Sequence, residues 1–189
     1  MKNITFKKAT IAHKKIIFSW LAEPHIQEFW DNTQAHKDDI LNFMDGRKKP
    51  SSYCNGKYVY WIGYTDSVPY AMLMTLEETN EDKIGELKLS NLSKTGNTYG
   101  LDYMIGNKEY FGKGFGARTL IDFIDFFRNE FDNKADTFFV DPEIENTRAV
   151  RVYEKAGFKH VSNFIMEGDC SGAGKLHHLL IKNFEARKG

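Results

Sequence analysis

The stretch FGKGFGARTL, residues 111–120, places three glycines at alternate positions directly before a run with helical spacing. Glycine tolerates positive φ and carries no side chain, so such a turn can aim several backbone N–H groups into one anion-binding concavity. The helix is predicted from the apolar residues Ala117, Leu120, Ile121, Ile124 and Phe127. A helix N-terminus carries partial positive charge, so the stretch predicts a phosphate site. An ordinary strand-to-helix turn also fits these letters, because short glycine motifs are common.

Length and charge narrow the class of protein. With 189 residues the chain is long enough for one well-buried core and short for two, so we expect a single domain over 1–189. Its 26 basic and 26 acidic residues balance, which argues against nucleic-acid or membrane partners. The chain has two cysteines, Cys54 and Cys170, without metal-ligand spacing, and it shows no signal-peptide pattern and no apolar run long enough to span a bilayer. We therefore expect a cytoplasmic protein without a metal.

The expected elements alternate between hairpins and helices. Apolar and β-rich runs predict strands at 4–9, 58–64, 70–78, 99–105, 137–140, 158–165 and 176–182. Helices are predicted from Thr10 to Pro24 and at about 35–45, 115–129 and 147–156. The first of these should bury Ala12, Ile16, Ile17, Trp20 and Leu21. Residues 79–97 are polar and give no clear prediction. One helical crossover in a hairpin-rich chain predicts a mixed sheet.

A second informative stretch is ENTRAVRVYEKAGF, residues 145–158. Its apolar face explains most of it as an ordinary packed helix, with Gly157 as the stop. This helix begins about 30 residues after the glycine turn, one βα unit away, so both helix starts should lie at the same edge of the sheet.

The two stretches together resemble the GNAT superfamily of N-acetyltransferases. NTRAVRVYEKAGF is similar to that family's Asn-x-x-Ala-x-x-x-Tyr-x-x-x-Gly-Phe signature, and the glycine loop to its pyrophosphate-binding loop. The resemblance implies an α/β (α+β) GNAT fold: a twisted, mostly antiparallel mixed sheet of six to seven strands, about four flanking helices, and two strands splayed at the acetyl-CoA site. The family usually has Arg or Gln where this chain has Phe111, so CoA affinity should depend on Lys113 or Arg118.

A narrower similarity concerns the acetyl acceptor. HIQEFW, GLD and VDPEIENTRAVRVYEKAGF occur in the kind and order found in aminoglycoside 6'-N-acetyltransferases, which implies transfer to a 6'-amine of these antibiotics in a ternary complex. Siderophore-type hydroxylamine or diamine acyltransferases share some of these features. A protein N-terminal acetyltransferase and a non-catalytic CoA-binding sensor or scaffold are further alternatives. We expect a small-molecule amine substrate and a monomer or homodimer.

The resemblance also assigns roles to residues. Asp102 aligns with the amine-binding base. Because an ordinary carboxylate is a weak base for an ammonium group, we expect Asp102 to orient the amine and pass its proton through water. Tyr153 is the candidate acid for the leaving thiol. The implied acetyl-CoA contacts are Met104, Ile105, Gly112, Lys113, Gly114, Phe115, Gly116, Ala117, Asn146, Ala149 and Tyr153.

A pocket for a polycation should gather carboxylates and rings that stack on sugars. The candidate substrate residues are therefore His25, Trp30, Glu77, Glu78, Asp102 and Asp141, with Phe29 beside Trp30. Simpler roles also fit: Glu77 and Glu78 as a solvated hairpin end, His25 as a packed loop residue and Asn146 as a helix cap. His177 and His178 alternate along a strand, so they cannot chelate one metal together.

Overall fold

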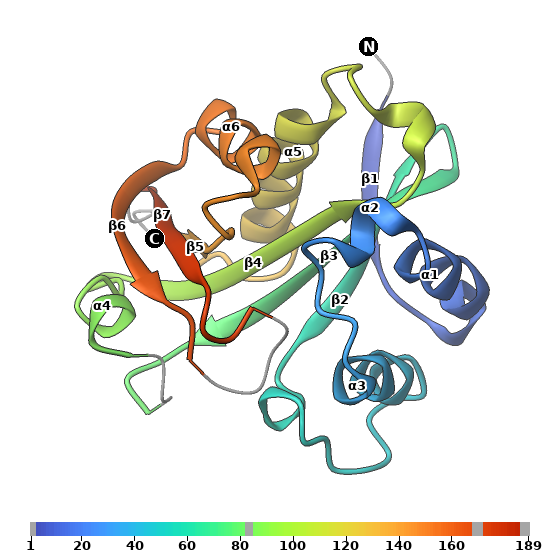
Figure 1. The fold of residues 1–189 in the computed structure, drawn as a ribbon, viewed down its shortest axis with the longest axis horizontal. Helices are drawn as coiled ribbons and strands as arrows, with labels where there is room; N and C mark the ends of the chain where they lie inside the picture. The colour runs from blue at the N-terminus through green and yellow to red at the C-terminus, as the bar shows by residue number, and fades with distance from the viewer. Residues whose placement is uncertain (1–2, 82–84, 168–171, 186–189) are drawn as a thin grey trace.

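The computed structural model describes residues 3–81, 85–167 and 172–185, so Cys170 lies outside the described part. One seven-stranded sheet runs through it in the order β1-β2-β3-β4-β5-β7-β6 (Figure 1). The strands are β1 Ile4–Lys8, β2 Val59–Thr65, β3 Val68–Glu78, β4 Asn97–Ile105, β5 Ala135–Val140, β6 Lys159–Ile165 and β7 Leu176–Asn183. Neighbouring strands are antiparallel except β4 and β5, which are parallel. The predicted mixed, mostly antiparallel sheet is confirmed.

The parallel pair separates along its length. β4 pairs with β5 only from Asn97, opposite Ala135, to Gly100, opposite Phe139. β4 then continues to Ile105 beside β3 alone. This divergence opens the sheet at the carboxyl ends of both strands, where open α/β sheets bind ligands.

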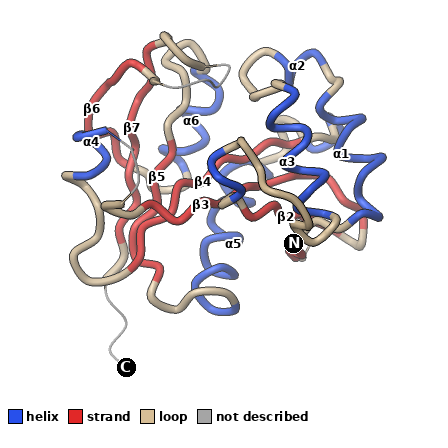
Figure 2. The backbone as a smooth tube through the Cα atoms, turned by 90° about the horizontal axis from the view of Figure 1, so that it is seen from below, coloured by secondary structure: helices blue, strands red, loops and turns tan. Residues whose placement is uncertain are grey.

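Six α-helices flank the sheet in the described residues: α1 Lys14–Leu21, α2 Pro24–Gln27, α3 Gln34–Met44, α4 Gly85–Leu89, α5 Phe115–Glu130 and α6 Thr147–Lys155. The two extra ones, α2 and α4, are too short for a periodic signal. α5 lies on the opposite side of the central strands from α1, α2 and α3 (Figure 2). Two expectations were wrong. Pro24 begins α2 rather than ending α1, and Ala12 is exposed because a 3-10 turn precedes α1.

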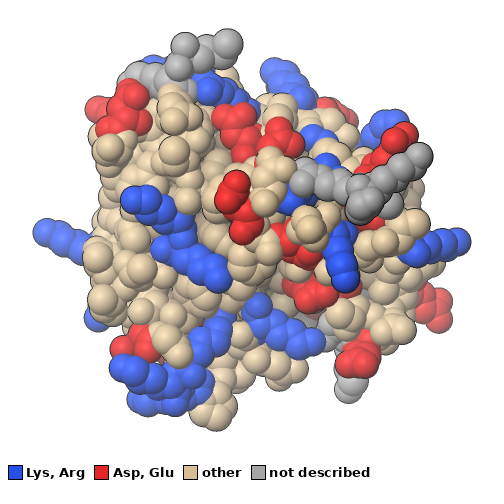
Figure 3. Space-filling model, turned by 180° about the vertical axis from the view of Figure 1, so that it is seen from behind, with Lys and Arg blue, Asp and Glu red and all other residues tan. Residues whose placement is uncertain are grey.

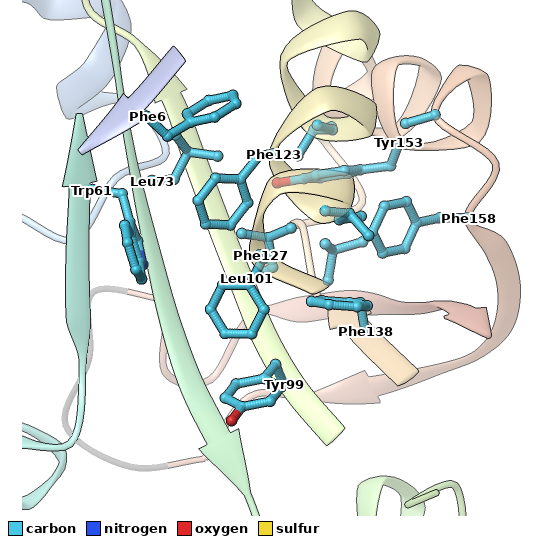
Figure 4. Packing of buried hydrophobic residues seen from close by; sticks show 14 of the residues in the cluster. Phe6, Trp61, Leu73, Tyr99, Leu101, Phe123, Phe127, Phe138, Tyr153 and Phe158 are labelled. Carbon is cyan, nitrogen blue, oxygen red and sulfur yellow. The ribbon is translucent and has the colours of Figure 1, made fainter. Parts of the chain in front are cut away.

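Alternating residues of the strands feed two cores. Trp61, Leu73 and Leu101 face α5 and α6, where they join Phe123, Phe127, Tyr153 and Phe158 (Figure 4). Edge-to-face ring contacts such as Trp61 to Phe123, 5.7 Å between centroids, recur through this core. The intervening residues Ile62, Met72 and Met104 face α1, α2 and α3. Because the faces alternate, Asp102 lies on the second face and Tyr103 on the first.

A buried ion pair holds the segment between α3 and β2. The carboxylate of Asp39, fully buried, accepts hydrogen bonds from Arg47 Nη1 at 2.6 Å and the Tyr60 hydroxyl at 2.8 Å. Arg47 Nη2 also donates to the carbonyl of Tyr58. These bonds fix the loop that carries Tyr53 and Tyr58.

Both charge signs occur on the face turned away from the view of Figure 1, where Lys and Arg lie among Asp and Glu (Figure 3). Among the described residues, none of the helices has the length and apolar character needed to cross a membrane.

Candidate functional site

A cleft of about 1370 Å³ opens where β4 and β5 diverge. One half is formed by the N-termini of α5 and α6, and the other by carboxylates of β3, β4 and the end of β5 together with aromatic residues of the first third of the chain. Of the predicted site residues, all line this cleft except Glu77 and Lys113.

The glycine turn uses its three glycines in two ways. Gly112 and Gly114 have φ of 70° and 78°, in the left-handed region that favours glycine. Gly116 is needed for space, because a Cβ there would lie 3.0 Å from the Tyr103 hydroxyl and 3.1 Å from Val152. Gly114 is the N-cap of α5 and supplies no side-chain cap, so the first N–H groups of α5 remain available at the cleft. The turn therefore fits a phosphate group.

The basic side chain of this half differs from the expected one. Arg118 forms an ion pair with Asp122 at 3.3 Å, and neither it nor Lys113 lines the cleft. Arg148, from the first turn of α6, does line it, and its guanidinium lies over the ring of Phe111 at 5.2 Å. Phe111 cannot donate a hydrogen bond to a phosphate, but its ring supports the guanidinium of Arg148, which can.

Asn146 and Tyr153 bring α6 to the same half. The Asn146 side chain accepts a hydrogen bond from the Ala149 N–H at 3.1 Å, so the expected cap is present. Tyr153 extends from α6 into the interior (Figure 4), and its ring packs edge-on against Phe158. Burial, and then the negative charge of Asp102, raise the pKa of the Tyr153 phenol well above its usual value. The phenol therefore stays protonated at neutral pH.

Asp102 lies at the junction of the two halves. No described residue forms a hydrogen bond or ion pair with its carboxylate, although the side chain is half-buried in the cleft. Burial, and then the charge of Asp141, raise the pKa of Asp102 to about 7. A carboxyl group that titrates near neutral pH can accept a proton from an amine far better than an ordinary aspartate.

We call the acceptor half the part of the cleft that is lined by the carboxylates of Glu78, Asp102 and Asp141 and by the aromatic residues of the first third of the chain. One ammonium group lies among these three carboxylates. Lys88 Nζ, on α4, lies 2.8 Å from Asp141 Oδ2 and 3.4 Å from Glu78 Oε1. Burial alone would raise the pKa of Asp141, but the Lys88 ammonium outweighs it and holds that pKa below its usual value. Glu78 reaches across Gly100, where a Cβ would lie 3.1 Å from Glu78 Oε1.

Glu77 was expected in the same cluster and is not part of it. It is exposed, and strand alternation directs it to the opposite face of β3 from Glu78.

The wall of the acceptor half is aromatic. It is formed by Phe29, Trp30, His36, Tyr53 and Tyr58. Several buried polar atoms here have no hydrogen-bond partner among the residues that the structure describes, for example Trp30 Nε1, Asp31 Oδ2 and His36 Nε2. Such atoms can be satisfied by hydroxyl or amino groups of a bound molecule.

Two histidines of the cleft lining, His25 and His177, contact backbone carbonyl oxygens. His25 Nε2 lies 3.3 Å from the Ile105 carbonyl oxygen, and the His25 ring packs edge-on against Phe111. His177 Nδ1 lies 2.6 Å from the Asp141 carbonyl oxygen, whereas His178 Nδ1 lies 2.7 Å from Asn163 Oδ1. His177 and His178 thus have separate hydrogen-bond partners.

The functional candidates that the sequence did not reveal are Lys88, Arg148, Tyr53 and Tyr58. Lys88 lies in the polar segment 79–97, which shows no periodicity, and Arg148 lies at an unspecified position of the second motif. Tyr53 and Tyr58 are tyrosines in or next to a loop.

Comparison with known proteins agrees with this geometry. A family model described as an acetyltransferase (GNAT) domain matches residues 10–166. The chain belongs to the GNAT acetyltransferases. It is therefore an N-acetyltransferase with acetyl-CoA as acetyl donor, and the alternative of a non-catalytic CoA-binding scaffold is set aside.

Individual GNAT relatives are similar over most of their length. The aminoglycoside N(6')-acetyltransferase type 1 of Klebsiella pneumoniae is 24% identical over 157 residues, which cover 83% of this chain and 74% of the relative. The crystal structure of an aminoglycoside N(6')-acetyltransferase from Legionella pneumophila superposes with a TM-score of 0.73 at 25% identity, covering 95% of this chain and 91% of the other. An aminoglycoside acetyltransferase in complex with coenzyme A and kanamycin superposes with a TM-score of 0.71 at 19% identity, covering 96% and 95%.

Proposed function

We propose that this GNAT enzyme transfers the acetyl group of acetyl-CoA directly to the 6'-amine of an aminoglycoside, both substrates being bound in the cleft together. The observation that carries the proposal is the placement of Asp102 between a phosphate-binding half and an acidic, aromatic half. The likeness to aminoglycoside acetyltransferases supports the choice of acceptor.

The half of the cleft at the N-termini of α5 and α6, here called the donor half, would hold acetyl-CoA. Acetyl-CoA supplies an acetyl group activated as a thioester. The α5 N-terminus and the glycine turn would bind the pyrophosphate through backbone N–H groups, with Arg148 adding a charged donor. The amide nitrogen of Asn146 is not used in the cap, so it can donate to the same ligand.

The acceptor half would bind an amino sugar. Trp30, Tyr53 and Tyr58 offer flat apolar surfaces to a sugar ring, while the unpartnered Asp31 and His36 atoms can bond its polar groups. Carboxylates around the reacting position favour a cationic substrate over a neutral one.

Asp102 and Tyr153 would move the protons. Asp102 takes one proton from the substrate ammonium, directly or through water, so that the neutral nitrogen can attack the thioester carbon. The C–S bond then breaks, and Tyr153 donates its proton to the departing thiolate. The acetylated nitrogen loses its second proton to water, Tyr153 is reprotonated from solvent, and Asp102 releases its proton to solvent, so one proton is released overall. The tyrosine is suited to this step because it is protonated before the thiolate forms.

A hydroxylamine or diamine of the siderophore type is the second candidate acceptor. The carboxyl group of Asp102 suits such an amine as well as an aminoglycoside, because it can accept a proton from either. A protein N-terminus is disfavoured, because the rings of the first third of the chain line a cleft rather than an open groove.

The test is a thiol-release assay with acetyl-CoA and a panel of 6'-amino aminoglycosides, polyamines, hydroxylamine precursors and basic peptides. Release of CoA with 6'-amino aminoglycosides, and none with analogues bearing a 6'-hydroxyl, is the expected result. Turnover confined to another class of amine would contradict the proposed acceptor but not the proposed acetyl-CoA site. An acetylated protein mass after incubation with acetyl-CoA alone would contradict direct transfer.

A further inference from the structure

Lys88 places a positive charge in the acceptor half of the cleft, whose carboxylates otherwise suit a cationic substrate. Its side chain is 16% exposed, it lines the cleft, and its ammonium contacts carboxylates of two different elements, Asp141 after β5 and Glu78 on β3. Burial opposes its charge, but these carboxylates outweigh burial and hold its pKa above the usual value. Lys88 is therefore charged at any working pH.

The carboxylates that bind Lys88 also act on the candidate base. The charges of four residues act on the pKa of Asp102: Asp141, Lys88, Glu78 and Asp31. Lys88 is the one cation among these four. A substrate ammonium group has the same charge and the same hydrogen-bond donors as a lysine side chain. A second ammonium group of the acceptor, beside the one that reacts, would have to compete with Lys88 for Asp141 and Glu78.

We propose that Lys88 is a specificity-determining residue, a tethered cation that occupies a second ammonium subsite next to Asp102. This inference rests on the proposed transfer to an amine. It means that the enzyme favours acceptors whose reacting amine has no neighbouring ammonium group, because an acceptor with two must displace Lys88 from its carboxylates or meet its repulsion.

A purely structural role predicts something different. Lys88 ties α4, a five-residue helix without buried residues, to β3 and the β5–α6 connection. If that were its whole function, replacing it would lower stability and activity alike for every acceptor. Selectivity between acceptors separates the two roles.

Kanamycin A and kanamycin B make the comparison direct, since they share the 6'-amine and differ at the 2' position, a hydroxyl in A and an amine in B. Lys88→Gln should raise the ratio of kcat/KM for B over A at least about tenfold, a change worth about 1.4 kcal/mol. Lys88→Arg keeps the positive charge and should keep the wild-type ratio. Lys175→Gln is the matched control, because Lys175 forms a comparable ion pair, 2.8 Å from Glu143, but does not itself line the cleft, although Glu143 does.

Calorimetric binding of both kanamycins to the same four proteins gives a second readout that needs no turnover. An unchanged B-over-A ratio in Lys88→Gln, or an equal change in Lys175→Gln, overturns the role of Lys88 whatever the activity. If wild type transfers acetyl to no amine, the proposed function fails, and the binding ratio still decides on Lys88. Should Lys88→Gln not fold, Lys88→Met carries the same prediction.

The pH profile adds a readout that a structural role would not move. Loss of the Lys88 charge removes the influence that lowers the pKa of Asp102, so the acid limb of kcat/KM should shift to higher pH in Lys88→Gln and stay in place in Lys175→Gln. A shift toward lower pH contradicts the proposal.

Discussion

The Arg148 guanidinium lies over the face of the Phe111 ring, with 5.2 Å between the guanidinium carbon and the ring centroid. The resemblance to the GNAT superfamily implies Arg or Gln where this chain has Phe111, and we propose that Arg148 on α6 supplies the charged phosphate donor instead. The aromatic face restrains a long side chain that would otherwise lose conformational freedom on binding.

Arg148→Gln should therefore weaken the acetyl-CoA site. We expect KM for acetyl-CoA to rise about tenfold, in line with one charge-assisted hydrogen bond, while kcat at saturating acetyl-CoA stays within about twofold. Steady-state kinetics measure both values. Arg118→Gln is the control with unchanged KM, because Arg118 pairs with Asp122 outside the cleft lining. Equal effects of both substitutions would count against Arg148.

Tyr153→Phe removes one hydroxyl and leaves the ring that packs against Phe158 and Tyr103. A positioned general acid contributes about 10²-fold or more, so kcat should fall by about that factor. Calorimetry should give unchanged CoA affinity. A wild-type kcat in this variant would reduce Tyr153 to a packing residue.

The pH dependence of wild type follows from Asp102. Burial and Asp141 raise its pKa to about 7, and only the ionised form accepts a proton. Activity should therefore be lost as pH falls below about 7 and rise to a plateau above it. A kcat/KM profile from pH 5 to 9 at constant ionic strength measures the midpoint. A midpoint near pH 4 would mean that Asp102 titrates as an ordinary aspartate.

Arg47→Met tests the buried pair under the acceptor wall. It leaves the fully buried Asp39 carboxylate without its cation, which should cost about 3–5 kcal/mol of unfolding free energy. Denaturant titration measures this cost. Lys48→Met removes an exposed partner of Asp45 and should change stability by less than about 1 kcal/mol. Equal effects of the two substitutions on the free energy of unfolding would contradict a stabilising role of the buried Arg47–Asp39 pair.

Local sequence signals predicted the glycine turn and the Asn146 cap, because both depend on local chemistry. The glycines of 112–116 and the Asn146 cap act within one turn of their own helices, so their residue types reveal their roles. The acceptor half depends on register between distant strands. β3 pairs Leu76 with Gly100, which brings Glu78 across Gly100 toward Asp102.

The wrong prediction for Glu77 and the failure to predict Lys88 have simple physical reasons. Adjacent residues of a strand face opposite sides, so Glu77 and Glu78 could not both enter one cleft, and alternation should have excluded one of them. Lys88 lies on a helix of five residues, too short to show periodicity, and its role depends on partners in β3 and after β5. No local pattern could have revealed that contact.

The most direct test of the proposed amine acetylation compares wild type with Asp102→Asn, which keeps the shape of the side chain and removes the base. With saturating acetyl-CoA and a 6'-amino aminoglycoside, we expect CoA release by wild type and a fall in kcat of about 10²-fold or more in the variant, with acetyl-CoA binding unchanged. Wild-type turnover by Asp102→Asn would contradict the claim that amine transfer is centred on Asp102.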